Sequence, residues 1–187
     1  MKIEKINISD QQVIPFLAKV DESLFYHSPA YLALLSEHLK AEAFYLVIKS
    51  NGIINSLMPV MVKKTQIGIV YNSLAYYGSN GSILQRNESY AEFASLVAFY
   101  YNLAESENAL SATIISNPLS ILDQKFWGKS EITPSDYRIG QITELPQREA
   151  DLMDLFSKPR PRNIRKAVNS GVNIKIMHEE ALSYLST

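Results

Sequence analysis

The sequence contains no cysteine, and this absence removes a whole set of chemistries. Disulfide bonds, thiolate nucleophiles and zinc sites built from cysteine are all excluded. The three histidines, His27, His38 and His178, lie far apart, without HxH or HExxH spacing. We therefore expect no metal site in this chain.

Motifs of nucleophilic catalysis and nucleotide binding are missing as well. The sequence has no GxSxG nucleophile elbow, no GxxxxGK[ST] phosphate loop and no GxGxxG fingerprint. Paired carboxylates such as Glu179 and Glu180 have no partner that would make them a general acid or base. The sequence therefore predicts no particular catalytic residue.

Long apolar runs are scarce. The longest, residues 93–101, is too short to span a bilayer and is interrupted by Ser95. The N-terminus, MKIEKINISDQQ, lacks the apolar core of a signal peptide. These features predict a cytoplasmic protein without an integral membrane segment.

The charge of the chain is unevenly distributed. The 187 residues suit one domain with a substantial core, and their net charge is −1. Residues 1–157 carry 12 Lys and Arg against 17 Asp and Glu, whereas residues 158–187 carry 6 against 2. The C-terminal piece would therefore attract an anion that the rest repels. General nucleic-acid binding is not expected, because it needs a wider basic surface.

Helix and strand patterns alternate along the chain, which predicts an α/β or α+β fold with a mixed, mostly antiparallel sheet flanked by helices. The clearest signal is a hairpin over 43–64 that turns at Asn51-Gly52, with Pro59 indicating a bulge or an edge. Ser28 and Pro29 predict a helix that runs to about Lys40. Further helices are expected over 9–19, 89–107, 119–127 and 148–156, and further strands over 2–8, 66–72, 111–116 and 137–145.

The most distinctive stretch is residues 157–175, SKPRPRNIRKAVNSGVNIK. It holds six basic residues, and no acidic residue occurs between Asp154 and Glu179. Its pattern predicts a helix that begins near Pro161 and ends at Gly171. The alternating apolar residues at 172, 174 and 176 then predict a half-buried strand.

On this expected helix the basic side chains share one face. At 100° per residue Arg162, Arg165 and Lys166 lie together, opposite Ile164, Ala167 and Val168. The guanidinium group of arginine can donate two parallel hydrogen bonds to a phosphate or a carboxylate. Three cations on one helical turn could therefore hold a diphosphate. We therefore expect these three residues, together with Arg160, to bind an anionic small molecule. The alternative is an ordinary solvated helix face.

A loop rich in glycine, serine and asparagine, residues 74–84, is a second candidate site. Glycine-rich backbone can approach a ligand closely, here at Gly78. The rings of Tyr76 and Tyr77 at the loop entrance could stack on a sugar or a peptide. The alternative is that both tyrosines end a core strand.

Several segments together resemble one family, the Fem-type peptidoglycan-bridge aminoacyl transferases and their acetyltransferase-like relatives. Residues 25–31, FYHSPAY, resemble its F-x-x-S-x-x-W segment, with Tyr31 in place of the tryptophan. Residues 46–64 resemble the hairpin that follows, and residues 77–79 resemble its YGG loop, with Ser79 in place of the second glycine. The basic segment RNIRKAVNSGVNIK, residues 162–175, resembles the family most.

The resemblance implies a GNAT-like (N-acetyltransferase-like) fold and transfer of an acyl or aminoacyl group to an amine of a cell-wall precursor or similar anionic acceptor. It also implies that a nucleotide-linked precursor lies against basic residues, which would be Arg162, Arg165 and Lys166. Residues 1–187 would form one GNAT-like domain, the N-terminal half of a two-domain transferase. A following segment would start at 178–187, and the second acetyltransferase-like domain would be missing.

The donor is left open by the resemblance. Aminoacyl-tRNA or acyl-CoA would serve the complete protein, while this chain has no Q/R-x-x-G-x-G/A acyl-CoA loop, and we expect no cofactor in it. A rival interpretation makes the chain a non-catalytic binding or assembly module whose basic helix docks an acidic partner.

Overall fold

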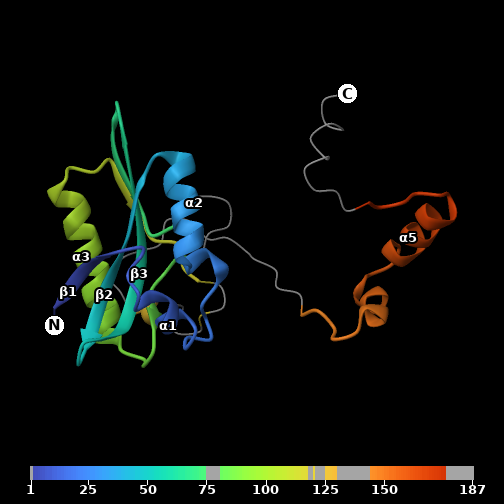
Figure 1. Ribbon diagram of the computed structural model, residues 1–187, viewed down its shortest axis with the longest axis horizontal. Coiled ribbons are helices and arrows are strands. Elements are labelled where there is room, and N and C mark those ends of the chain that lie inside the picture. The colour runs from blue at the N-terminus through green and yellow to red at the C-terminus, as the bar shows by residue number, and fades with distance from the viewer. Residues whose placement is uncertain (1, 75–80, 118–119, 121–124, 130–143, 176–187) are drawn as a thin grey trace. The chain divides into compact units, whose positions relative to one another are not determined.

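The computed structural model of the protein describes residues 2–74, 81–117, 120, 125–129 and 144–175. The chain divides into two compact units, residues 1–138 and 139–187, and each is described by itself. Figure 1 shows the strands and the helices α1, α2 and α3 in the first unit, and α5 in the second.

The first unit is built on a six-stranded sheet. The strands follow the order β1-β2-β3-β4-β6, and β5 pairs with β3. All pairs are antiparallel except β4 with β6, which is parallel. The strands are β1 (Ile3–Asn7), β2 (Glu42–Ser50), β3 (Ile53–Thr65), β4 (Gly68–Asn72), β5 (Leu84–Gln85) and β6 (Ser111–Thr113).

Helices cover both faces of this sheet, as Figure 1 shows for α3 on one side and α2 on the other. Because successive side chains of a strand point to opposite faces, β2 supplies two separate cores. Phe44 and Leu46 pack in the cluster that includes α3, whereas Tyr45 and Val47 pack in the cluster that includes α1. The helices are α1 (Val13–Leu17), the 3₁₀ helix η1 (Phe25–His27), α2 (Pro29–Leu39) and α3 (Tyr90–Ser106). The expected class, a mixed and mostly antiparallel sheet flanked by helices, is confirmed.

The helix boundaries follow local chemistry. Helix α2 begins as expected, since the Tyr31 backbone N–H donates to Ser28 Oγ at 3.2 Å and Pro29 is the first helical residue. The helix expected over 9–19 is shorter, covering only α1. There, the Gln12 N–H donates to Asp10 Oδ1 at 2.9 Å, so Asp10 forms a turn and does not cap a helix at that point.

The hairpin around Asn51-Gly52 is confirmed, with Tyr45 opposite Pro59 across the β2–β3 pair. On its other side β3 pairs with β4 at Met61–Thr65 and with β5 at Ser56–Leu57. Pro59 therefore lies between the segments of β3 that pair with β4 and with β5. A proline suits this position because it has no backbone N–H to donate to a neighbouring strand. The register of the β2–β3 pair shifts away from Pro59, between Ile48 and Lys49 of β2.

The remaining predicted helices and strands are confirmed in part. The strands expected over 2–8, 66–72 and 111–116 and the helix over 89–107 are confirmed as β1, β4, β6 and α3, with β6 shorter than expected. The strand expected over 137–145 and the helix over 119–127 fall largely outside the described residues. No helix in the described part of the chain has both the length and the apolar character needed to cross a membrane.

The second unit contains the 3₁₀ helix η2 (Glu149–Leu155) and helix α5 (Arg160–Asn169). The basic helix is thus confirmed, and Gly171 beyond its end has the positive φ of 78° expected of a terminating glycine. The strand expected next is wrong for residues 172–175, which pair with no described strand. Val172 and Ile174 are 58% and 95% exposed. The Val172 N–H donates to the Ala167 carbonyl of α5 at 3.1 Å. Alternating apolar residues form a strand only where a second strand can bond to their backbone.

Candidate functional site

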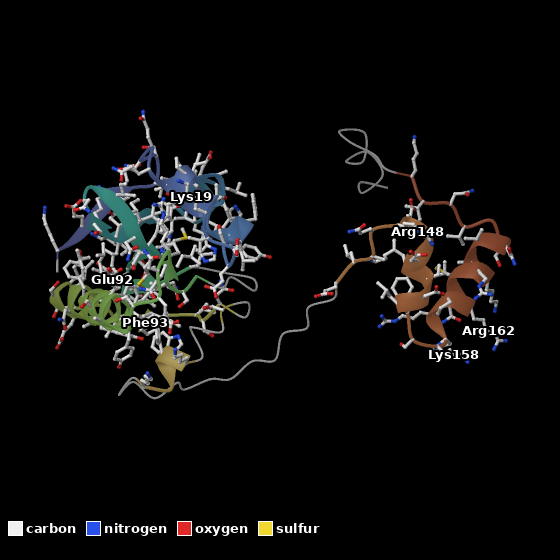
Figure 2. All side chains as sticks on the ribbon, turned by 90° about the horizontal axis from the view of Figure 1, so that it is seen from below. Lys19, Glu92, Phe93, Arg148, Lys158 and Arg162 are labelled. Carbon is white, nitrogen blue, oxygen red and sulfur yellow. The ribbon has the colours of Figure 1, made fainter. Side chains whose placement is uncertain are left out.

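The candidate site is the set of cations on α5. Arg160, Arg162, Arg165 and Lys166 are all exposed. Figure 2 shows the labelled Arg162 side chain projecting outward from the second unit. None of the four forms an ion pair with a described residue, so their positive charges are available to a ligand.

The same unit offers a contrast in Arg148. Its guanidinium donates two hydrogen bonds to Asp151, from Nε at 3.0 Å and from Nη2 at 2.7 Å. This bonding raises the pKa of Arg148 above its ordinary value. Arg148 is therefore already satisfied by a carboxylate, in the bidentate geometry that guanidinium groups favour. The α5 cations have no such partner in the described residues.

The α5 face is open. The two described clefts are lined by residues of the first unit, and no side chain described between 144 and 175 is buried. Ile164 and Val168, on the side of the helix opposite Arg162, Arg165 and Lys166, are 40% and 64% exposed. An open cationic face can bind and orient a multiply charged anion, but salt screens it strongly.

The second candidate site cannot be placed in the same way. Tyr76, Tyr77 and Gly78 lie outside the described residues, and their expected role in binding stays a prediction. The described residues on either side pack tightly: Leu74 is fully buried, and a Cβ at Gly81 would lie 2.2 Å from Leu74 Cβ.

The sequence reasoning missed a polar cluster between β3 and α3. Glu92 Oε2 accepts a hydrogen bond from Asn55 Nδ2 at 2.7 Å and another from Ser56 Oγ. Gln85 Nε2 donates to Ser56 Oγ at 3.0 Å, and Ser89 Oγ caps α3 by accepting from the Glu92 N–H at 3.3 Å. The Ser89-x-x-Glu92 spacing, a capping-box signature, could have revealed the cap of α3 but not the bonds that Glu92 accepts from β3.

This polar cluster lies at the N-terminus of α3. Exposed N–H groups and the helix dipole make such a terminus attractive to anions. In this protein the carboxylate of Glu92 already lies in the first turn, where it complements the dipole and is held by donors from β3. The cluster therefore fastens the helix to the sheet.

Three buried tyrosines have strongly perturbed acidity. Burial raises the pKa of Tyr45, Tyr71 and Tyr100 above the ordinary value. The hydroxyl of Tyr45 donates to the His27 carbonyl at 2.7 Å, and that of Tyr100 donates to the Thr113 carbonyl at 3.0 Å. The hydroxyl protons of Tyr45 and Tyr100 are therefore held by backbone carbonyls in the core. Within the described residues, no group of three or more His, Asp and Glu side chains is arranged to hold a metal ion.

Comparison with solved structures gives distant likenesses. No family model and no curated protein matches the sequence. The chain is similar to the crystal structure of a ribosomal-protein-alanine N-acetyltransferase from Brucella melitensis biovar Abortus 2308, at 12% identity and a TM-score of 0.49, covering 77% of this chain and 100% of that one. It is also similar to an acetyltransferase from Trypanosoma brucei, at 12% identity and a TM-score of 0.48, covering 76% of this chain and 99% of that one. The structure of a "probable acetyltransferase" has 9% identity and a TM-score of 0.48, covering 79% of this chain and 100% of that one.

Proposed function

We propose that this chain is part of a GNAT-like acyltransferase of the Fem type, which transfers an acyl or aminoacyl group to an amine of an anionic cell-wall precursor. The proposal is supported mainly by the exposed cations on α5, which have no ion-pair partner among the described residues. The sequence resemblance over residues 25–31, 46–64 and 162–175 supports the family assignment. The cell-wall substrate rests on that resemblance alone.

In this proposal α5 positions the acceptor and performs no chemistry. Arg162, Arg165 and Lys166 bind the diphosphate of a nucleotide-linked precursor, and Arg160 adds to the attraction from another side of the helix. Binding of this kind brings reacting groups together and contributes to rate through orientation. The donor, aminoacyl-tRNA or acyl-CoA, would be engaged by the complete two-domain protein.

A second candidate function is a non-catalytic docking module. The exposure of Ile164 and Val168 on the same short helix as the cations favours it, because protein interfaces combine apolar contacts with a charged rim. In that case the natural ligand of α5 would be an acidic segment of another protein.

Calorimetric titration with a nucleotide-linked muropeptide tests the proposal. We expect the Arg162→Ala/Arg165→Ala variant to bind the muropeptide at least about tenfold more weakly than the wild type, because two charge-assisted contacts to phosphate are lost. The matched control is Lys19→Ala/Lys64→Ala, which removes the same charge from exposed positions of the first unit. This control should retain wild-type affinity.

The outcomes separate the two functions. Equal affinity of the arginine variant and the wild type would contradict the proposed site. Binding of a polyglutamate peptide that is weakened by Ile164→Ser/Val168→Ser, together with no muropeptide binding, would establish the docking module. Equal weakening in the lysine control would show that only net charge matters.

A further inference from the structure

A small cleft lies in the first unit beside α1, well separated in sequence from the basic helix. Its volume is about 250 Å³. Gln11 and Gln12 line it from the turn before α1, Phe16 from α1 itself, and Gly52 and Ile53 from the β2–β3 hairpin. Arg86 is the only charged residue among those that line it.

The backbone of Arg86 is fixed by the sheet. The residue directly follows β5, and its N–H donates to the Asn55 carbonyl of β3 at 2.9 Å. Its side chain reaches toward α1, where Cζ lies 5.9 Å from the ring centroid of Phe16. Phe16 is fully buried, so the guanidinium rests beside a ring that cannot move away.

The described residues offer no hydrogen-bond acceptor to the guanidinium of Arg86. Its Nε is buried and has no hydrogen-bond partner among the described residues, and no described carboxylate pairs with it. Arginine carries five N–H donors, and buried donors are nearly always bonded. An acceptor drawn from solution into the cleft would satisfy the terminal nitrogens, which a carboxylate can bind in pairs.

The remaining walls suit a small organic anion. Gly52 has a φ of 79°, and nothing lies within 4 Å of the position that a Cβ would occupy, so its backbone is open to a ligand. Ile53 is 54% exposed and adds an apolar wall. Gln11 and Gln12 contribute amide groups that can donate or accept. One cation, an apolar wall and neutral amides match a monoanion that carries a short hydrocarbon chain.

We propose that this cleft binds a small organic carboxylate of about amino-acid size, whose carboxylate pairs with Arg86 and whose aliphatic part lies on Ile53. The volume of about 250 Å³ is slightly below the range of about 300–1,000 Å³ that pockets for drug-sized ligands have, which favours a ligand smaller than a drug. The inference does not depend on acyl transfer or on α5.

Titrations of the ¹⁵N-labelled chain with sodium acetate, sodium butyrate and inorganic phosphate, at constant ionic strength, test this proposal. We expect saturable shifts of the Gly52 and Gln12 amides and of the Arg86 Nε–H signal. Butyrate should bind about fivefold to tenfold more tightly than acetate, because its extra methylenes contact the apolar wall. Arg86→Gln should abolish saturation while the spectrum of α3 stays unchanged.

Two further variants keep the test decisive. Ile53→Thr, which retains a β-branched strand residue, should reduce the preference for butyrate and leave acetate binding in place. Lys19→Gln, which removes an exposed cation outside the cleft, should change nothing. Linear shifts without saturation, identical shifts in Arg86→Gln, or saturation by phosphate alone would overturn the proposal.

Discussion

Replacing Phe93 with alanine should lower the free energy of unfolding by about 3–5 kcal/mol. Phe93 is 2% exposed on the inner face of α3, and its ring centroid lies 5.3 Å from that of Phe126 and 5.1 Å from that of Trp127. Truncation removes the buried ring and leaves a cavity between helix and sheet. Urea unfolding followed by circular dichroism measures the loss.

The same helix supplies the control. Phe99 is 38% exposed against 2% for Phe93, so Phe99→Ala makes the identical chemical change where less apolar surface is buried. Its cost should stay below about 1 kcal/mol. Similar losses for the two variants would contradict the assignment of Phe93 to the core.

Raising the pH above about 10 should destabilise the protein steeply. Tyr45, Tyr71 and Tyr100 are buried, and burial raises the pKa of each phenol. Below the ordinary pKa the phenols are protonated in both states, so their contribution is fully present. Above it the unfolded chain releases protons that the folded chain retains, which costs up to about 1.4 kcal/mol per pH unit for each tyrosine.

Urea unfolding at pH 8, 10 and 11 measures this effect, and a Tyr45→Phe/Tyr100→Phe variant identifies its source. Phenylalanine does not titrate, so the variant should lose less stability per pH unit than the wild type above pH 10, whatever its stability at pH 8. Parallel pH profiles for the two proteins would show that other groups cause the alkaline loss.

The sequence predicted those elements whose signals are local. Ser28-Pro29 marks the start of α2, Asn51-Gly52 marks the hairpin, and Gly171 marks the end of the basic helix, because each depends on the chemistry of one or two residues. The sequence also predicted β2 as the first strand of that hairpin, but it did not show which helix covers which face of the sheet.

The structural features that the sequence did not predict depend on contacts between segments far apart in the chain. The alternation at residues 172–176 suggested a strand, but a strand requires a neighbour, and none is described for residues 172–175. The exposure of Ile164 and Val168 likewise depends on what packs against α5. The bonding of Glu92 to Asn55 and Ser56 joins residues more than 30 positions apart, which composition and spacing do not reveal.

The most direct test of whether the cations of α5 bind a charged ligand is the salt dependence of the protein's affinity for the muropeptide. Exposed ion pairs are screened over about 10 Å at 0.1 M salt and about 3 Å at 1 M. Wild-type affinity should therefore fall markedly between 50 mM and 500 mM sodium chloride, and Arg162→Ala/Arg165→Ala should show a clearly flatter dependence. Identical salt profiles for the two proteins would contradict the account.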